Sequence, residues 1–287
     1  MKLLITGIGG QLGSEILKVS DYENFGIYLN EEPRSSNGTF VKCDITNRDR
    51  LIETIKKIRP DWVLHLASAT KVEWCEENKE AARRINVDGT KNVVEGCKEA
   101  NSNMIFISSD SVFDGKKGNY KEDDKTNPIN FYGKTKLDGE QLVKTLPNHV
   151  IGRSCLMYSS KMGTFTSWVL DGLKKGDVEA AVDITSSPTL ASELAECLLF
   201  IVKKDLRGIY HTAGDEAITK YEFIKKFAEA FGHNVNLVKP VRQEDLELKA
   251  LRPKNSSLDI SKIKSAGFKF SKVDGALRKL KKEVEDQ

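Results

Sequence analysis

Tyr132 and Lys136 are four residues apart in NPINFYGKTKLDGEQLV, the segment that runs from Asn127 to Val143. Residues i and i+4 share one face of a helix, so the phenol and the ammonium group can meet if this segment is helical. A phenol with the usual pKa of about 10 is a poor acid at neutral pH until a cation stabilises its phenolate. The pair is therefore either a proton donor with the cation that tunes it, or two neighbours on a surface.

The same spacing occurs at Tyr221 and Lys225, so spacing alone does not identify a site. Tyr221 lies in TKYEFIKKFAEAFG, where Phe and Ala alternate as they do at the edge of a core. Tyr132, in contrast, follows the strand candidate MIFISS, which brings Ser109 to a strand end. A carbonyl that is reduced there needs a hydrogen-bond donor and an acid. This context favours Tyr132 over Tyr221.

A glycine-rich segment, ITGIGGQLGSEIL, follows the first strand candidate directly and opens a helix. Its glycines are Gly7, Gly10 and Gly13. We expect Gly7 to permit a tight turn, Gly10 to let backbone amides approach a pyrophosphate, and Gly13 to allow close helix–strand packing. The position between a strand and a helix gives the motif its meaning, and it predicts dinucleotide binding.

The adenosine of a dinucleotide is expected near the end of the second strand. The usual carboxylate for a ribose hydroxyl is replaced there by Asn30, and Arg34 follows, which favours a 2′-phosphate and therefore NADPH. Glu31 or Glu32 could instead serve a ribose hydroxyl, so NADH stays open. Asp44, at the end of the third strand, could accept from the adenine amino group.

These residues need a parallel sheet to bring them together. Short apolar runs alternate with helical patterns at 11–19, 47–58, 77–100 and 131–146, which is typical of a doubly wound α/β (Rossmann) fold. We expect a dinucleotide-binding domain over residues 1–160, with 188–214 folding back onto its sheet. Residues 161–187 and 215–287 are expected to form a smaller C-terminal lobe that binds the substrate.

The composition excludes several classes of function. The net charge of +3, from 45 basic and 42 acidic residues, gives no reason to expect nucleic acid or an anionic membrane as a partner. No apolar run approaches the ~20 residues of a membrane span, and the first residues do not look like a signal peptide. Five dispersed Cys and four dispersed His predict buried thiols in the cytoplasm and no metal site.

Seven segments together resemble the extended short-chain dehydrogenase/reductase family, and within it the chain is similar to the dTDP-4-dehydrorhamnose reductases. They read TGIGGQLG, CDITN, INVDGTKNV, SSDSVFDG, NPINFYGKTKLDGE, SSPT and RPKNSSLD, and they span nearly the whole chain. The resemblance implies that NAD(P)H reduces the C4 ketone of a nucleotide-linked 4-keto-6-deoxy sugar in a protein that forms homodimers.

The resemblance also implies roles for individual residues. Ser109, Tyr132 and Lys136 would be catalytic, and Ser109, Asp110 and Leu156 would face the sugar. Asp110 could equally be a structural carboxylate that caps a turn. Together with the glycine and adenosine positions above, the cofactor contacts would fall on Gly7, Gly10, Gln11, Leu12, Gly13, Asn30, Arg34, Asp44, Ile45, Ala67, Ser68, Ala69, Thr70, Tyr132 and Lys136.

Two departures from the family pattern leave alternatives open. RSCLMY places Leu156 where the family typically has Trp, and Ser111 replaces a typical Tyr. This less aromatic wall could accept another sugar or mark a relative that binds NADP without catalysis, like the regulatory β subunit of methionine adenosyltransferase. A nucleotide-sugar epimerase is a further alternative. A dehydratase is disfavoured because Asp110 is not followed by the second carboxylate that elimination requires.

Overall fold

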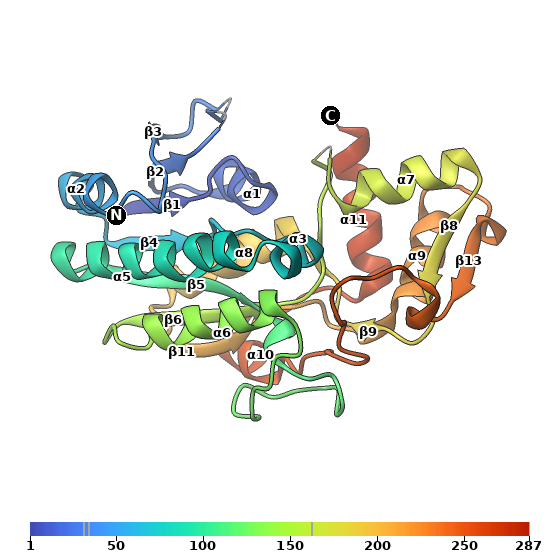
Figure 1. Ribbon diagram of the computed structural model, residues 1–287. Helices are drawn as coiled ribbons and strands as arrows, with labels where there is room; N and C mark the ends of the chain where they lie inside the picture. Colours follow the sequence, from blue (N-terminus) through green and yellow to red (C-terminus); the bar gives the residue numbers. More distant parts are fainter. Residues whose placement is uncertain (31, 34, 162, 287) are drawn as a thin grey trace.

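A seven-stranded parallel sheet forms the centre of the protein (Figure 1). The computed structural model describes residues 1–30, 32–33, 35–161 and 163–286. The strand order is β11-β6-β5-β4-β1-β2-β3. Strands β2 and β3 follow on one side of β1 and β4 on the other, so the order of the strands reverses between β1 and β4. The strands are β1 (Lys2–Thr6), β2 (Glu23–Tyr28), β3 (Thr39–Lys42), β4 (Trp62–His65), β5 (Asn103–Ser109), β6 (His149–Ser154) and β11 (Gly208–His211).

Helices cover both faces of this sheet, which confirms the doubly wound fold. Apolar residues of α1 (Gln11–Val19), α8 (Ala191–Lys203) and α10 (Ser261–Ala266) pack with Leu3 and Ile5 on one face. Residues of α2 (Arg48–Ile58), α5 (Gly89–Ala100) and α6 (Phe131–Val143) pack with Leu4 on the other. Successive strand residues point to opposite faces, so a strand buried on both sides is apolar throughout, as β1 is.

The prediction of one helix over residues 77–100 is wrong. The chain forms α3 (Val72–Glu77) and α4 (Lys79–Arg83), then a π-helical turn at Arg84–Asp88, before α5 begins. A π turn inserts an extra residue into the helical repeat and often lies at a functional site. Here the buried residue Asn86 of the π turn hydrogen-bonds to the loop after β4. The extra residue of the turn lets the Asn86 side chain face that loop.

A third apolar cluster builds a smaller lobe, at the right of Figure 1. It comprises α7 (Phe165–Lys175), α9 (Lys220–Ala230) and α11 (Val273–Glu285) with the paired strands β8 (Val178–Ala181) and β13 (Val238–Val241). Short strand pairs join β7 (Met157–Tyr158) to β10 (Thr189–Leu190) and β9 (Thr185–Ser186) to β12 (Ile218–Thr219). The division of the chain into two domains at the residue numbers given above stays a prediction.

Among the residues that the structure describes, no helix combines the length and apolar character that crossing a bilayer requires.

Candidate active site

A cavity of about 1380 Å³ lies where the carboxyl ends of the central strands meet the lobe. Open α/β sheets bind ligands at this edge, near the point where strand order reverses. Every predicted site residue in the described part of the chain lines the cavity, and Arg34 falls outside the described residues. The lining includes Gly7, Gly10, Gln11, Leu12, Gly13, Asn30, Asp44, Ile45, Ala67, Ser68, Ala69, Thr70, Ser109, Asp110, Tyr132, Lys136 and Leu156.

The glycine-rich turn has the geometry that a pyrophosphate needs. Gly7 adopts a φ of 71°, and a Cβ there would lie 2.8 Å from the backbone nitrogen of Ala67. Gly10 precedes α1 as its N-cap and supplies no side-chain cap, so the first amides of that helix are left to a ligand. A Cβ on Gly13 would lie 2.4 Å from the carbonyl oxygen of Ile8, so this glycine packs against the turn itself rather than a strand.

A cation that the sequence reasoning missed lies at the same turn. The Lys161 ammonium donates to the carbonyl of Gly9 and to Ser14 Oγ, 3.3 Å away. It would add positive charge beside a bound pyrophosphate. At the adenosine end, Asp44 Oδ1 accepts from the backbone amide of Thr46 at 2.8 Å, which fixes the orientation of the carboxylate. These residues fit an NAD(P) dinucleotide.

Asn86 fixes the loop that carries Ser68, Ala69 and Thr70. Its Oδ1 accepts from the amide of Ala69 at 2.7 Å and from Ser68 Oγ at 2.9 Å. Its Nδ2 donates to the carbonyl of Ala69 and to Thr135 Oγ1, both at 3.0 Å. The amide thus ties this loop to α6. Asn86 lies in the segment INVDGTKNV, but its role could not be predicted from the sequence, because the π turn that directs it inward has no evident pattern.

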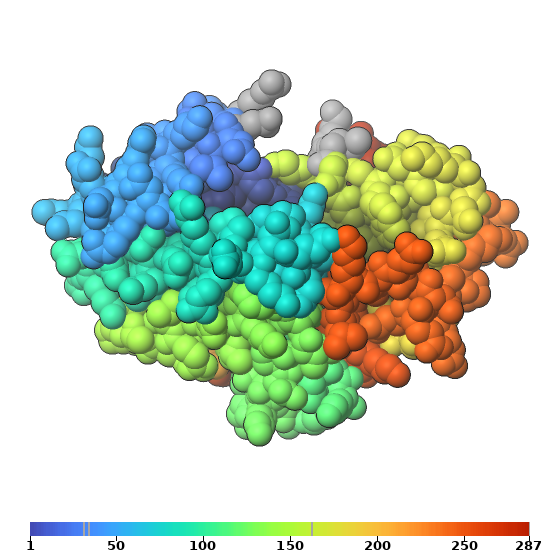
Figure 2. Space-filling model, viewed as in Figure 1, coloured from blue at the N-terminus to red at the C-terminus, as the bar shows by residue number. Residues whose placement is uncertain are grey.

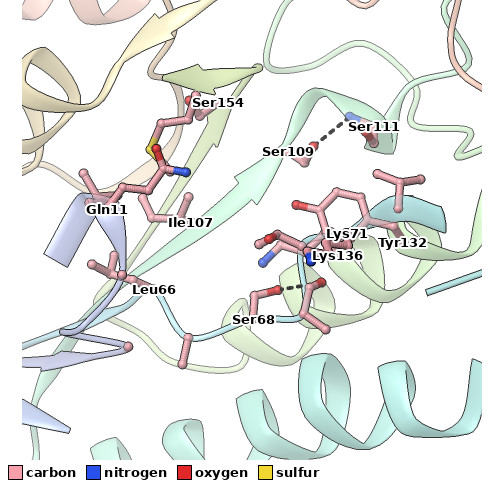
Figure 3. A pocket seen from close by; sticks show the side chains of 18 of the residues that line it. Gln11, Leu66, Ser68, Lys71, Ile107, Ser109, Ser111, Tyr132, Lys136 and Ser154 are labelled. Atoms are coloured by element: carbon pink, nitrogen blue, oxygen red, sulfur yellow. Dashed lines mark hydrogen bonds between the residues drawn. The ribbon is translucent and has the colours of Figure 1, made fainter. Parts of the chain in front are cut away.

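The Ser109, Tyr132 and Lys136 side chains converge at one end of the cavity (Figure 3). Ser109 ends β5, while Tyr132 and Lys136 lie one turn apart on α6. The close approach depends on Gly133, since a Cβ there would lie 2.1 Å from the carbonyl oxygen of Ser111. Asn130 caps the helix by accepting from the amide of Gly133 at 2.8 Å.

Burial has the largest effect on the pKa values of Tyr132 and Lys136. It raises the pKa of Tyr132, although hydrogen bonding with Ser109 lowers it and the charge of Asp110 raises it further. Burial also lowers the pKa of Lys136 to about 7, although the Glu140 carboxylate raises it. The Lys136 ammonium lies 4.2 Å from the ring centroid of Phe106. The lowered phenol pKa that we expected from Lys136 is therefore not found, because burial is the largest influence on Tyr132 and raises its pKa.

Asp110 is enclosed by hydroxyl donors beside the phenol. Ser109 Oγ donates to its Oδ1 at 3.0 Å, and Ser256 Oγ donates to its Oδ2. Burial raises the pKa of Asp110, and the hydrogen bonds from Ser256 and Ser109 partly lower it. The carboxylate therefore orients the hydroxyl of Ser109 within the cavity.

Two cations reach the cavity from the lobe, and the sequence reasoning assigned a role to neither. Lys220 lies 5.3 Å from the ring centroid of Trp168 and forms no ion pair with any residue that the structure describes. Its pKa is lowered by burial and by the charge of Arg252. Arg252 begins the family segment RPKNSSLD, and this segment was the sequence feature from which a role for Arg252 could have been predicted. Glu73 pairs with Arg252, but the cavity still carries the charge of Lys220, and this favours an anionic ligand.

Comparisons with known proteins agree with this geometry. The family described as "RmlD substrate binding domain" matches residues 1–285. A dTDP-4-dehydrorhamnose reductase of Aggregatibacter actinomycetemcomitans is 33% identical, with 98% of this chain and 98% of that protein covered. Methionine adenosyltransferase 2 subunit beta of Danio rerio is 28% identical, with 93% of this chain and 85% of that protein covered. The Bacillus anthracis dTDP-4-dehydrorhamnose reductase, solved in complex with NADP, has a TM-score of 0.88 and 28% identity, with 98% of this chain and 99% of that chain covered.

Proposed function

The chain belongs to the RmlD substrate binding domain family, and we propose that it is an NAD(P)H-dependent reductase of the C4 ketone of a nucleotide-linked 4-keto-6-deoxy sugar. The observation that carries the proposal is the convergence of Ser109, Tyr132 and Lys136 in one cavity with the glycine-rich turn. Relatives named dTDP-4-dehydrorhamnose reductase, one of them bound to NADP, support NADPH as the preferred cofactor and NADH as the alternative.

The dinucleotide, when bound, supplies the hydride that adds to the carbonyl carbon. Tyr132 Oη gives its proton to the developing alkoxide, and a phenol kept protonated by burial suits this direction of the reaction. The ammonium of Lys136 stabilises the phenolate that remains. Without substrate, Ser109 Oγ donates its single proton to Asp110; with the ketone bound, the hydroxyl turns to donate to the substrate oxygen and holds it near the phenol.

The rest of the cavity accommodates the nucleotide part of the substrate. Lys220 and Arg252 supply the positive charge that a diphosphate needs. Leu156 and Ser111 line the cavity near the sugar position, so the wall there is less aromatic than in the family pattern. We therefore propose a nucleoside-diphosphate sugar as substrate, with the identity of the sugar set beside Leu156.

The test is NADPH oxidation, followed at 340 nm, with a dTDP-4-keto-6-deoxyhexose. We expect Tyr132→Phe to lower kcat by roughly 10²–10⁴-fold, the range for loss of a general acid, while the protein still binds NADPH. Tyr221→Phe is the matched control because Tyr221 has the same spacing to a Lys outside the cavity, and it should keep wild-type kcat. A wild-type kcat in Tyr132→Phe would remove Tyr132 from the mechanism.

The second candidate is an NADP-binding regulatory subunit. The match to methionine adenosyltransferase 2 subunit beta and the Leu at position 156 favour it. NADPH binding without turnover of any nucleotide-linked keto sugar, unchanged in Tyr132→Phe, would replace the reductase proposal with this one.

We also propose that the protein is a cytoplasmic homodimer. All five cysteines are buried and unpaired in the structure, which fits a reducing compartment. The dimer rests on resemblance to the family, and light scattering of the purified protein at micromolar concentration tests it. A monomeric mass across that range would refute the dimer.

A further inference from the structure

The Glu73 carboxylate on α3 holds a loop of the lobe against the sheet domain. The loop is residues 246–252, which we call the lobe loop. Glu73 Oε2 accepts from the backbone amide of Lys249 at 2.8 Å and from that of Ala250 at 3.0 Å. Glu73 Oε1 accepts from Arg252 Nη2 at 2.6 Å. Both oxygens of Glu73 are therefore committed to residues about 175 positions later in the chain, and Figure 2 shows the orange surface of this region against the cyan surface of α3.

The lobe loop also forms one wall of the cavity. Leu246, Leu248 and Arg252 line it, as do Thr70 and Val72 of the sheet domain. The guanidinium of Arg252 makes two bonds, to Glu73 and to the carbonyl of Ala250 at 3.3 Å. A planar guanidinium held at Nη1 and Nη2 has a fixed orientation, so its remaining donors have a fixed direction as well.

The same anchor reaches the catalytic helix. Asn130, the residue that caps α6, donates from Nδ2 to the carbonyl of Leu251 at 2.9 Å. Glu76, also on α3, accepts from the amide of Phe131 at 2.9 Å, at the first residue of α6. Helix α3 therefore sets the position of the lobe loop relative to the helix that carries Tyr132.

We propose that Glu73 is a positioning residue that holds the lobe loop closed and directs Arg252 toward the anionic group of the sugar nucleotide. The inference rests on the proposed function, because that function supplies the anion. It predicts that loss of Glu73 weakens binding of the nucleotide sugar while the phosphate cradle at Gly7–Gly13 keeps its affinity for NADPH.

Only a carboxylate can make all three contacts. A Gln at position 73 has one oxygen, so it can accept from the two loop amides or from Arg252 but not from both sets. Its NH₂ group would face a donor instead. Glu77, on the same helix, offers a matched control. Among the residues that the structure describes, its carboxylate pairs with the Lys249 ammonium, and the two side chains are 43% and 65% exposed.

The experiment compares Glu73→Gln, Glu73→Asp and Glu77→Gln in the full-length protein with NADPH bound. We expect Glu73→Gln to raise the KM for the dTDP-4-keto-6-deoxyhexose by roughly tenfold, the scale of one charge-assisted hydrogen bond, with kcat within about threefold. Glu73→Asp should restore part of the affinity, and Glu77→Gln should match wild type. The Kd for NADPH should not change in any of them.

Hydrogen exchange at the Lys249 and Ala250 amides provides a readout that needs no substrate. Protection should fall in Glu73→Gln and persist in Glu77→Gln. A wild-type KM in Glu73→Gln, or unchanged protection, overturns the inference while the reductase proposal stands. A wild-type protein that reduces no such sugar refutes the proposed function, and the substrate part of this inference falls with it.

Discussion

Replacing Glu140 by Gln should cost about 3–5 kcal/mol of unfolding free energy, the range for breaking a buried ion pair. Glu140 and Arg153 are 0% and 2% exposed. Glu140 Oε1 accepts from Ser108 Oγ at 2.6 Å and from Arg153 Nε at 2.9 Å, and Oε2 accepts from Arg153 Nη2 at 2.8 Å. The amide variant leaves the guanidinium charged, buried and without a counter-charge, which accounts for most of the loss.

The loss converts into a measurable shift of the unfolding midpoint. Unfolding entropy is about 2.1 cal/mol/K per residue, or about 0.6 kcal/mol/K for a chain of 287 residues. The midpoint should therefore fall by about 5–8 °C. Calorimetry, and urea unfolding with an unchanged m-value, measure it. Glu99→Gln is the control, since Glu99 pairs with Lys56 at the surface and its loss should leave the midpoint nearly unchanged.

A double-mutant cycle separates the buried charge from the lost contacts. Glu140→Leu with Arg153→Leu should cost less than the sum of the two single changes, because the pair removes both charges together. The reasoning is refuted if Glu140→Gln shifts the midpoint no more than Glu99→Gln does. The candidate active site supplies an independent readout, because the charge of Glu140 raises the pKa of Lys136. We expect kcat/KM to fall near pH 7, where Lys136 loses its proton. This fall should move to lower pH in Glu140→Gln.

Two further predictions concern Lys136 and Gly13. Burial lowers the pKa of Lys136 to about 7 in the folded state. The unfolded state therefore binds more protons between about pH 7 and 10.4. The contribution of Lys136 to the free energy of unfolding rises with pH across that window. Lys136→Met should therefore raise the melting temperature more at pH 6 than at pH 10 while abolishing turnover, and an equal gain at both pH values would contradict the reasoning. Gly13→Ala should weaken NADPH binding by about tenfold or more because its Cβ meets the backbone of Ile8. Val19→Ala, at the exposed end of the same helix and outside the cavity, is the control and should bind normally. Fluorescence titration of NADPH distinguishes the two, and equal affinities would remove the steric argument.

The sheet could be predicted from the sequence because its signals are local. Buried parallel strands are apolar throughout and are bounded by turn residues, as in KLLIT. The glycine-rich turn was recognisable for the same reason, since Gly7, Gly10 and Gly13 lie within seven residues. The helix at Tyr132 was recognisable from its four-residue spacing to Lys136. Residues that act within one helix or one turn leave their pattern in adjacent positions.

Contacts between distant segments could not be predicted in this way. The π turn at Arg84–Asp88 has no local signature, because its cause is the hydrogen bonding of Asn86 to a loop 17 residues earlier. The link from Glu73 to Arg252 spans 179 residues. No spacing rule relates positions that far apart.

The sequence by itself therefore determined the fold class, the position of the glycine-rich turn and the placing of Tyr132 and Lys136 on one helix, from which we propose a proton-donor pair. Only the tertiary structure decided the protonation behaviour of that pair, because burial raises the pKa of Tyr132 and lowers that of Lys136 by an amount that depends on every neighbouring atom. It also decided which distant cations and carboxylates meet at the cavity. Desolvation and long-range contact are properties of the folded volume, and a linear pattern of residues carries neither.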